Sequence, residues 1–302
     1  MDGSDPAAQT CRVPSLQAAG ARLSYIRSGT GPAVLLIQGV GIVGEGWRPQ
    51  IDELGARFDM LAFDNRGIGL SERGQGELTI EAMASDALAI VDAEKIGRFH
   101  LVGHSMGGLI AQAVALSAPE RIASLALLCT FENGKQGSRP TLGMLGTAIR
   151  TRIGTRQSRR DAFLELVMPR SYLKTVDRMQ LAHDLKPFFG HDLADQPPIV
   201  MRQLRAMSKY DARSRLAELA SIRTLVVSAT DDRIALPAYG RGLAAAIPGA
   251  RLVEIPDAGH GLTIQRAPEV NALLSEHFAP GAEMTSASAS APAPAMDRDA
   301  AE

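Results

Sequence analysis

A serine set between glycines is the residue best suited to nucleophilic chemistry in this chain. Ser105 lies in Gly-His-Ser-Met-Gly at residues 103–107, a Gly-x-Ser-x-Gly pattern. A short apolar run at 99–102 precedes it and an alanine-rich apolar run at 109–116 follows it, so we expect a buried strand, one sharp turn and a helix. A turn of this kind exposes the serine Oγ, and its glycines leave room for neighbouring backbone.

A serine nucleophile needs a base that takes its proton and an acid that orients the base. His260 directly follows an expected strand at 251–255, and the adjacent aspartates Asp231 and Asp232 follow an expected strand at 224–228. Serine, aspartate and histidine in this chain order is the order that accompanies a Gly-x-Ser-x-Gly turn. We therefore predict a catalytic triad of Ser105, one of the two aspartates and His260.

Expected strands and helices alternate along most of the chain. Apolar runs predict strands at 33–38, 58–63, 99–102, 124–130, 224–228 and 251–255, after a hairpin at 16–25. Helical spacing covers 47–54 and 78–92, with Thr79 as the N-cap. This alternation predicts an α/β fold with a mostly parallel sheet that is covered on both faces and binds ligands at the carboxyl ends of its strands.

Residues 132–216 interrupt the alternation and predict an inserted helical lid. They contain helical patterns at 141–153, 160–167, 171–185 and 198–207, and no convincing strand. The core would then comprise residues 15–131 and 217–280. We expect residues 1–14 to form a flexible lead-in, and residues 281–302, which include a run of serine, alanine and proline, to be disordered.

Composition and charge exclude several classes of partner. The 302 residues include 32 basic and 33 acidic side chains, so the net charge of −1 favours neither nucleic acid nor an anionic membrane. No apolar stretch approaches the roughly 20 residues that span a bilayer, and the N-terminus lacks the pattern of a secretory signal. The two cysteines, Cys11 and Cys129, make neither a disulfide framework nor a metal cluster. We expect a cytoplasmic protein without a metal.

A fourth motif makes the chain resemble a known family. Residues 64–71, Asp-Asn-Arg-Gly-Ile-Gly-Leu-Ser, are similar to an Asp-x-Arg-Gly-x-Gly-x-Ser loop. Together with the serine turn, the aspartate and histidine segments and residues 210–216, this loop resembles the α/β-hydrolase fold superfamily. The likeness lies in the branch that contains esterases, enol-lactonases and cofactor-free haloperoxidase-like enzymes. It covers about residues 16–278 and implies that fold, an inserted lid and no cofactor.

The resemblance also implies roles for particular residues. The family's acid precedes Arg-hydrophobic-x-x-Pro, which fits Asp232 better than Asp231, so Asp231 is the second choice. An oxyanion hole is implied at the backbone N–H groups of Val40 and Met106. The family usually has His-Gly after the first buried strand, and Gln38 stands in place of that histidine here.

Other residues near these motifs have two interpretations. Trp47 and Gln38 are candidate substrate contacts, and core packing is an equal alternative for Trp47. We expect His104 to pack or hydrogen-bond beside the nucleophile. Arginines of the predicted lid are interpreted as a solvated helix face, with attraction of an anionic substrate as the alternative; they are Arg150, Arg152, Arg156, Arg159 and Arg160.

The sequence thus predicts a serine hydrolase that cleaves a small carboxylic ester or lactone through an acyl-enzyme. In this hypothesis Ser105 attacks, His260 moves the proton and Asp232 orients His260. Two alternatives remain open, because fold alone does not define a reaction. One is another reaction on the same fold, by a cofactor-free haloperoxidase, a C–C bond hydrolase or an acyltransferase. The other is a non-enzymatic small-molecule receptor that retains the triad. Oligomeric state is not indicated.

Overall fold

A computed structural model describes residues 14–18, 20–138 and 142–279 of the chain. The predicted tail at 281–302 and all of the predicted lead-in except Pro14 lie outside these residues. At the centre is an eight-stranded sheet with the order β1-β2-β4-β3-β5-β6-β7-β8. Its strands are β1 (Ser15–Ala18), β2 (Ala21–Ser28), β3 (Ala33–Ile37), β4 (Asp59–Phe63), β5 (Phe99–His104), β6 (Ile122–Leu128), β7 (Thr224–Ala229) and β8 (Arg251–Ile255).

Six neighbouring strands of this sheet run parallel. β3 pairs with β4 and β5, and the parallel pairing continues through β6, β7 and β8. β1 and β2 form the antiparallel hairpin predicted from the sequence, and β2 then pairs antiparallel with β4. Every residue of β4, β5 and β7 is buried, as expected for apolar strands covered on both faces. The predicted fold class, a mostly parallel sheet flanked by helices, is confirmed.

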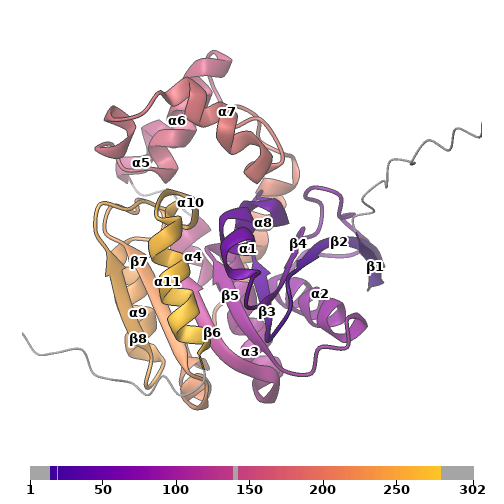
Figure 1. Ribbon diagram of the computed structural model, residues 1–302. Helices are drawn as coiled ribbons and strands as arrows, with labels where there is room; N and C mark the ends of the chain where they lie inside the picture. The colour runs from indigo at the N-terminus through magenta and orange to yellow at the C-terminus, as the bar shows by residue number, and fades with distance from the viewer. Residues whose placement is uncertain (1–13, 19, 139–141, 280–302) are drawn as a thin grey trace, which may run out of the picture.

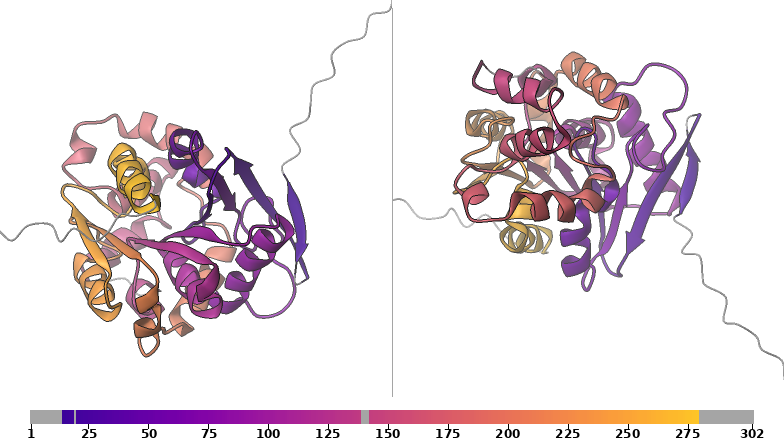
Figure 2. Two further views of the ribbon diagram at one scale, coloured as in Figure 1. Left: turned by 60° about the horizontal axis from the view of Figure 1, so that its bottom comes forward. Right: turned by 90° about the horizontal axis from the view of Figure 1, so that it is seen from above.

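Helices cover both faces of the sheet. Figure 2 (left) shows α1 and α11 on one face and α2 and α3 on the other, and within each pair the two helices are in contact. The helices around the sheet are η1 (Gly44–Trp47), α1 (Arg48–Leu54), α2 (Ile80–Ala93), α3 (Met106–Ser117), α9 (Pro237–Ala246), α10 (Leu262–Gln265) and α11 (Ala267–Phe278), with the short turns η2 (Pro119–Arg121) and η4 (Leu216–Ser221). Thr79 caps α2 as predicted, because its Oγ1 accepts a hydrogen bond from the Ala82 N–H. None of the described helices is long and apolar enough to cross a membrane.

The described residues between β6 and β7 are helical and include none of the sheet's strands. They form α4 (Gly134–Ser138), α5 (Leu142–Arg150), α6 (Arg156–Val167), η3 (Tyr172–Lys174), α7 (Arg178–Phe189) and α8 (Ile199–Lys209). Figure 1 shows α5, α6 and α7 standing beyond one end of the sheet, above α10. These helices have a hydrophobic cluster of their own, in which Leu164, Leu185 and Phe189 are buried.

One predicted helix in this region is wrong in its extent. The pattern at 171–185 predicts a single helix, but the structure has the short turn η3 and then α7, which begins at Arg178. The break occurs at Asp177, whose carboxylate accepts hydrogen bonds from the N–H groups of Met179 and Gln180. Asp177 is thus an N-cap, and it starts a new helix inside a region with continuous helical spacing.

Candidate active site

The turn between β5 and α3 carries Ser105 in a backbone conformation that few side chains adopt. Its φ is 55° and its ψ is −120°. A Cβ on Gly103 would lie 2.3 Å from the carbonyl oxygen of Gly107, and a Cβ on Gly107 would lie 2.0 Å from that of Ile37. Both positions therefore require glycine, and the predicted sharp turn is present. Strained residues of this kind cluster at functional sites.

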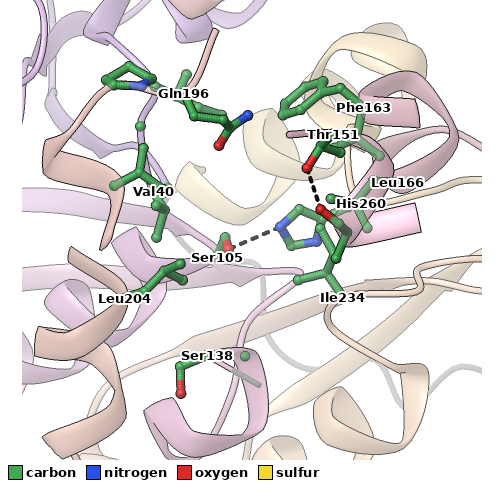
Figure 3. Close-up of a pocket in the computed structure, with 18 of the residues that line it drawn as sticks. Val40, Ser105, Ser138, Thr151, Phe163, Leu166, Gln196, Leu204, Ile234 and His260 are labelled. Atoms are coloured by element: carbon green, nitrogen blue, oxygen red, sulfur yellow. Dashed lines mark hydrogen bonds between the residues drawn. The ribbon is translucent and has the colours of Figure 1, made fainter. Parts of the chain in front are cut away.

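Ser105, His260 and Asp232 form one hydrogen-bonded chain. The Ser105 Oγ lies 3.0 Å from Nε2 of His260, and Nδ1 of His260 lies 2.7 Å from Oδ2 of Asp232 (Figure 3 shows the first of these contacts). A carboxylate can only accept, so Nδ1–H donates to Asp232, and Nε2 of the neutral ring accepts the serine proton. All three side chains are buried, and they come from three loops at the carboxyl ends of β5, β7 and β8.

The loop after β7 distinguishes the two adjacent aspartates. Oδ1 of Asp232 accepts hydrogen bonds from the N–H groups of Ile234 and Ala235, at 2.7 and 2.8 Å, which leaves Oδ2 for His260. Asp231 is exposed to solvent. The thiol of Cys129 is buried, and its burial together with the negative charge of Asp232 raises the pKa of the thiol. The structure thus brings Asp232, and not Asp231, to the histidine.

The loop that carries His260 is tied to two other parts of the chain. The Gly261 N–H donates to the carbonyl oxygen of Val167, the last residue of α6, at 2.8 Å. The His260 carbonyl oxygen accepts a hydrogen bond from Nε2–H of His104 at 2.8 Å. Burial lowers the pKa of His104 to about 3, with a further contribution from nearby His260, so this ring is neutral near neutral pH. His104 therefore lies beside the nucleophile and holds the loop of the second histidine, in agreement with the predicted packing or hydrogen-bonding position.

The glycine-rich loop after β3 leaves one backbone donor free beside Ser105. The Gly39 N–H donates to Oε1 of Gln38 at 3.2 Å, and the Gly41 N–H donates to Oε1 of Gln203 at 2.8 Å. Between them, the Val40 N–H has no acceptor among the described residues. A Cβ on Gly39 would lie 3.1 Å from the Cβ of Ser105, so this loop runs directly past the nucleophile.

A second free donor lies at the start of α3. Met106 is the first residue of this helix, so its N–H has no acceptor in the preceding turn. Ser105 and Val40 both line the same cavity, and α3 begins directly after the nucleophile. The geometry is therefore compatible with the two predicted oxyanion donors, the N–H groups of Val40 and Met106.

Gln203 is a part of this arrangement that sequence reasoning missed. It lies on α8, is fully buried, and is separated from Gly41 by more than half of the chain. On the other side of the same loop, the side-chain amide of Asn65 donates to the Gln38 carbonyl oxygen at 3.1 Å. A buried amide inside an amphipathic helix is a signal that could have identified Gln203, but its partner could not be read from spacing.

The loop at 64–71 supports the neighbouring turns through Asp64 and Arg66. The carboxylate of Asp64 accepts hydrogen bonds from the N–H groups of Gly44 and Leu70, at 2.7 and 2.9 Å. The guanidinium of Arg66 and the carboxylate of Asp86 form a buried ion pair, with a contact of 2.7 Å. Burial raises the pKa of both carboxyl groups, and the hydrogen bonds oppose that rise.

Three potential metal ligands lie close together, but both histidines are already hydrogen-bonded. Ligand atoms of His104, Cys129 and His260 lie within 4.8 Å of one another. The ring nitrogens of His260 contact Ser105 and Asp232, and Nε2 of His104 donates to a carbonyl oxygen. Burial and the nearby Asp232 raise the pKa of the Cys129 thiol, which opposes formation of the thiolate that a metal would bind. Only Nδ1 of His104 has no partner among the described residues. This donor set fits the hydrogen-bonded chain and does not fit a metal.

A cavity of ≈ 450 Å³ opens onto Ser105 and His260. Figure 3 shows Val40, Leu204, Ile234, Phe163 and Leu166 around these two side chains, with the Gln196 amide on the opposite wall. Most of the lining side chains are apolar, and many come from α5, α6 and α8, including Met144, Ile149, Val200, Met201 and Met207. Such a cavity suits a small, largely apolar ligand with a reacting group at Ser105.

Trp47 and Gln38 are not among the residues that line this cavity. Trp47 is fully buried in the main hydrophobic core, where its ring packs edge-on against His104 at 6.4 Å between centroids. Gln38 is buried, and its side chain accepts from the Gly39 N–H. Trp47 contacts His104 and Gln38 contacts Gly39, and neither side chain lines the cavity. This geometry therefore gives no evidence for the predicted substrate contacts.

This chain belongs to the α/β-hydrolase family. The model of the alpha/beta hydrolase fold matches residues 32–267, which include the serine turn, both aspartates and His260. The family that the motifs resemble is therefore confirmed.

Known relatives cover nearly the whole described fold. RutD of Azorhizobium caulinodans is 30% identical over 267 residues, which make up 87% of this chain and 97% of RutD. The crystal structure of an enol-lactonase from Burkholderia xenovorans LB400 is 30% identical, covers 88% of this chain and 99% of its own, and has a TM-score of 0.73. A thermophilic esterase from Thermogutta terrifontis is 27% identical, with coverage of 87% and 96% and a TM-score of 0.70. Esterases and lactonases are therefore among the homologues of this chain.

Proposed function

We propose that this protein is a serine hydrolase that cleaves a carboxylic ester or a lactone. The observation that carries the proposal is the continuous hydrogen-bonded chain from the Ser105 Oγ through His260 to Asp232. It has the geometry of nucleophile, base and orienting acid, and the nucleophile opens onto a cavity that fits a small molecule.

In the first half of the reaction, the Ser105 Oγ attacks the acyl carbon while Nε2 of His260 removes the serine proton. The carbonyl oxygen becomes negatively charged, and the N–H groups of Val40 and Met106 stabilise it. The imidazolium of His260 then gives its proton to the leaving alkoxide as the C–O bond breaks. In a lactone, this alcohol stays attached to the acyl group.

In the second half, His260 removes a proton from water, and the resulting hydroxide attacks the acyl-enzyme. The ester bond to Ser105 breaks, the serine recovers its proton from His260, and a carboxylic acid is released. Asp232 fixes the Nδ1–H tautomer of His260 and stabilises the imidazolium that forms in each half. Its two backbone hydrogen bonds hold the carboxylate in the required orientation.

We also propose that residues 132–216 act as the lid of this site. Helices α5, α6 and α8 contribute much of the cavity lining, so their side chains select the substrate and limit the access of water. Their separate hydrophobic cluster supports a lid that packs as a unit. An enol-lactonase and an esterase among the relatives support the choice of reaction.

The proposal is tested with p-nitrophenyl esters of increasing acyl length and with a panel of lactones. We expect turnover by the wild-type protein, loss of turnover in Ser105→Ala, and wild-type rates in Ser85→Ala, which changes an exposed serine of α2. A serine-directed phosphonate should add to the peptide that contains Ser105, as detected by mass spectrometry. Failure of both turnover and labelling would refute the hydrolase, and labelling without turnover would favour the receptor alternative.

A further inference from the structure

Among the described residues that line the cavity, Arg152 has the single permanently charged side chain. The described residues that line it include no aspartate, glutamate or lysine. Its other titratable side chains are the histidines His104, His191 and His260. An arginine on a mostly apolar wall gives the cavity a positive potential that no carboxylate of the described lining cancels.

Three neighbouring arginines of the same region are paired with carboxylates. Arg150 contacts Glu165 at 3.1 Å, Arg156 contacts Asp195 at 3.0 Å, and Arg160 contacts Asp192 at 2.9 Å. The partial or full exposure of these three side chains agrees with their interpretation as a solvated helix face. Within the described residues, no carboxylate partners Arg152.

The contact that Arg152 does make leaves its charge uncompensated. Its guanidinium lies 3.0 Å from the thioether sulfur of Met201, which is a weak acceptor. This contact connects the residues after α5 to α8 across the wall of the cavity. The contact with Met201 therefore holds the guanidinium at the cavity wall and leaves most of its N–H donors available to a ligand.

Arg152 lies at the open end of the cavity, and the reacting groups lie at the closed end. Arg152 is exposed, and its neighbours in the lining, Ile149 and Met201, are 49% and 53% exposed. Ser105 and His260 are only 6% and 8% exposed. The cavity thus has a nucleophile at its buried end, apolar walls, and a cation at its mouth.

From this arrangement we propose that the substrate carries a carboxylate at the end remote from its scissile ester, and that Arg152 binds this carboxylate. The inference rests on the proposed hydrolase function and names its substrate class. The planar fork of an arginine matches a carboxylate with two parallel hydrogen bonds, and one guanidinium balances its single negative charge. The apolar walls then hold the carbon chain between the two polar ends.

The test compares each acidic ester with its neutral counterpart. One series consists of mono-p-nitrophenyl esters of dicarboxylic acids from glutarate to sebacate, each beside the corresponding methyl ester. A second series consists of acetyl esters of ω-hydroxy acids and their methyl esters, which places the carboxylate on the alcohol side. In at least one series, the wild-type kcat/KM should favour the acid over its methyl ester at one chain length.

Arg152→Gln should reduce this preference by about 10- to 100-fold, the range for a charge-assisted hydrogen bond, mainly through KM. Arg152→Lys should restore part of it, because a lysine keeps the charge but not the fork. The matched control is Arg202→Gln, which removes an exposed arginine of α8 that does not line the cavity and should keep the wild-type preference. Added salt should weaken the preference in the wild-type protein.

The outcomes separate this inference from the proposed function. If esters are hydrolysed without a preference for the acid in either series, the role of Arg152 is overturned and the proposed hydrolase function is retained. The same holds if Arg152→Gln leaves the preference intact. If no ester is hydrolysed, calorimetry decides. Monomethyl suberate, but not dimethyl suberate, should bind to the Ser105→Ala protein. In the double variant that also carries Arg152→Gln, the affinity for monomethyl suberate should be at least about tenfold lower. Equal or absent binding of the two compounds would overturn the inference.

Discussion

The side-chain oxygen of Gln203 accepts a hydrogen bond from the backbone N–H of Gly41 at 2.8 Å, and so joins α8 to the loop beside the nucleophile. This contact uses the N–H that follows Val40 in the chain. It therefore fixes the peptide next to the proposed oxyanion donor without using that donor. The orientation of the Val40 N–H depends on a side chain of a distant helix.

Replacing Gln203 with leucine should lower kcat by about tenfold, with a smaller change in KM. The expected loss is less than the roughly 10²- to 10³-fold that follows removal of an oxyanion donor, because the donor remains and only its support is lost. Steady-state kinetics on a p-nitrophenyl ester would measure it. Gln203→Glu, which retains an acceptor oxygen, should recover part of the rate, and Arg202→Gln should match the wild type. A wild-type kcat in Gln203→Leu would show that the contact does not position the loop.

Asp232→Asn should reduce turnover by about 10³- to 10⁴-fold, because an amide does not stabilise the imidazolium and favours the wrong tautomer of His260. Asp231→Asn changes an exposed side chain and should leave turnover close to wild type. The two variants differ from the native chain by the same chemical change at adjacent positions, so each is the control of the other. A larger loss in Asp231→Asn would reverse the assignment of the acid.

Three buried histidines should make the protein less stable in mild acid. Burial lowers the pKa of His100 and His277 to about 4 and that of His104 to about 3. The unfolded chain binds protons at these rings below about pH 6.5, whereas the folded chain does so only near pH 4 or below. The contribution of these rings to the free energy of unfolding is therefore fully present above about pH 6.5 and falls as the pH decreases toward 4, by about 1.4 kcal/mol per pH unit for each ring.

Urea unfolding between neutral pH and the acid range would measure this slope. His277→Gln should reduce the slope by about one proton, since the unfolded state then binds one proton fewer. His183→Gln changes an exposed histidine of α7 and should leave the slope unchanged. An identical slope in the wild type and His277→Gln would contradict the prediction.

Gly107→Ala should destabilise the fold by about 3 kcal/mol or more, or prevent folding. The added Cβ would lie 2.0 Å from the Ile37 carbonyl oxygen, so β3 and the nucleophile turn would have to separate. Gly97→Ala is the matched control, because no atom lies within 4 Å of its added Cβ. It should be neutral or stabilising by up to about 1 kcal/mol. Thermal unfolding of the two purified variants distinguishes these outcomes, and equal stability would contradict the steric argument.

The sequence was most informative where a local pattern has one structural solution. Apolar runs located the strands to within about two residues, because fully buried parallel strands leave little room for polar side chains. The Gly-x-Ser-x-Gly pattern identified the turn at Ser105 for a related reason, since neither flanking glycine has space for a Cβ. The hydrogen-bonded chain to His260 followed from loops placed at the same edge of the sheet.

Contacts between distant segments could not be predicted in this way. The pairing of Gln203 with Gly41 spans the sheet and the lid, and nothing in the spacing of either segment indicates the other. For Trp47 the sequence left two positions open, the pocket and the core, and the ring packs into the core. Arg152 also resembles its neighbours in sequence, and it differs from Arg150, Arg156 and Arg160 in having no carboxylate contact among the described residues.

Two of the hydrogen bonds between the proposed lid and the site differ in how they tolerate sequence divergence. The Gly261 N–H is held by the main-chain carbonyl of Val167, which a residue of any type at that position would supply. The Gly41 N–H is held by a side chain, and few residues other than glutamine could reach it with an acceptor oxygen. In descendants of this protein that acquire other substrates, the sequences of α5, α6 and α7 can therefore change widely. Position 203 is constrained, because its side chain must reach Gly41, which is distant in sequence and close only in the folded chain.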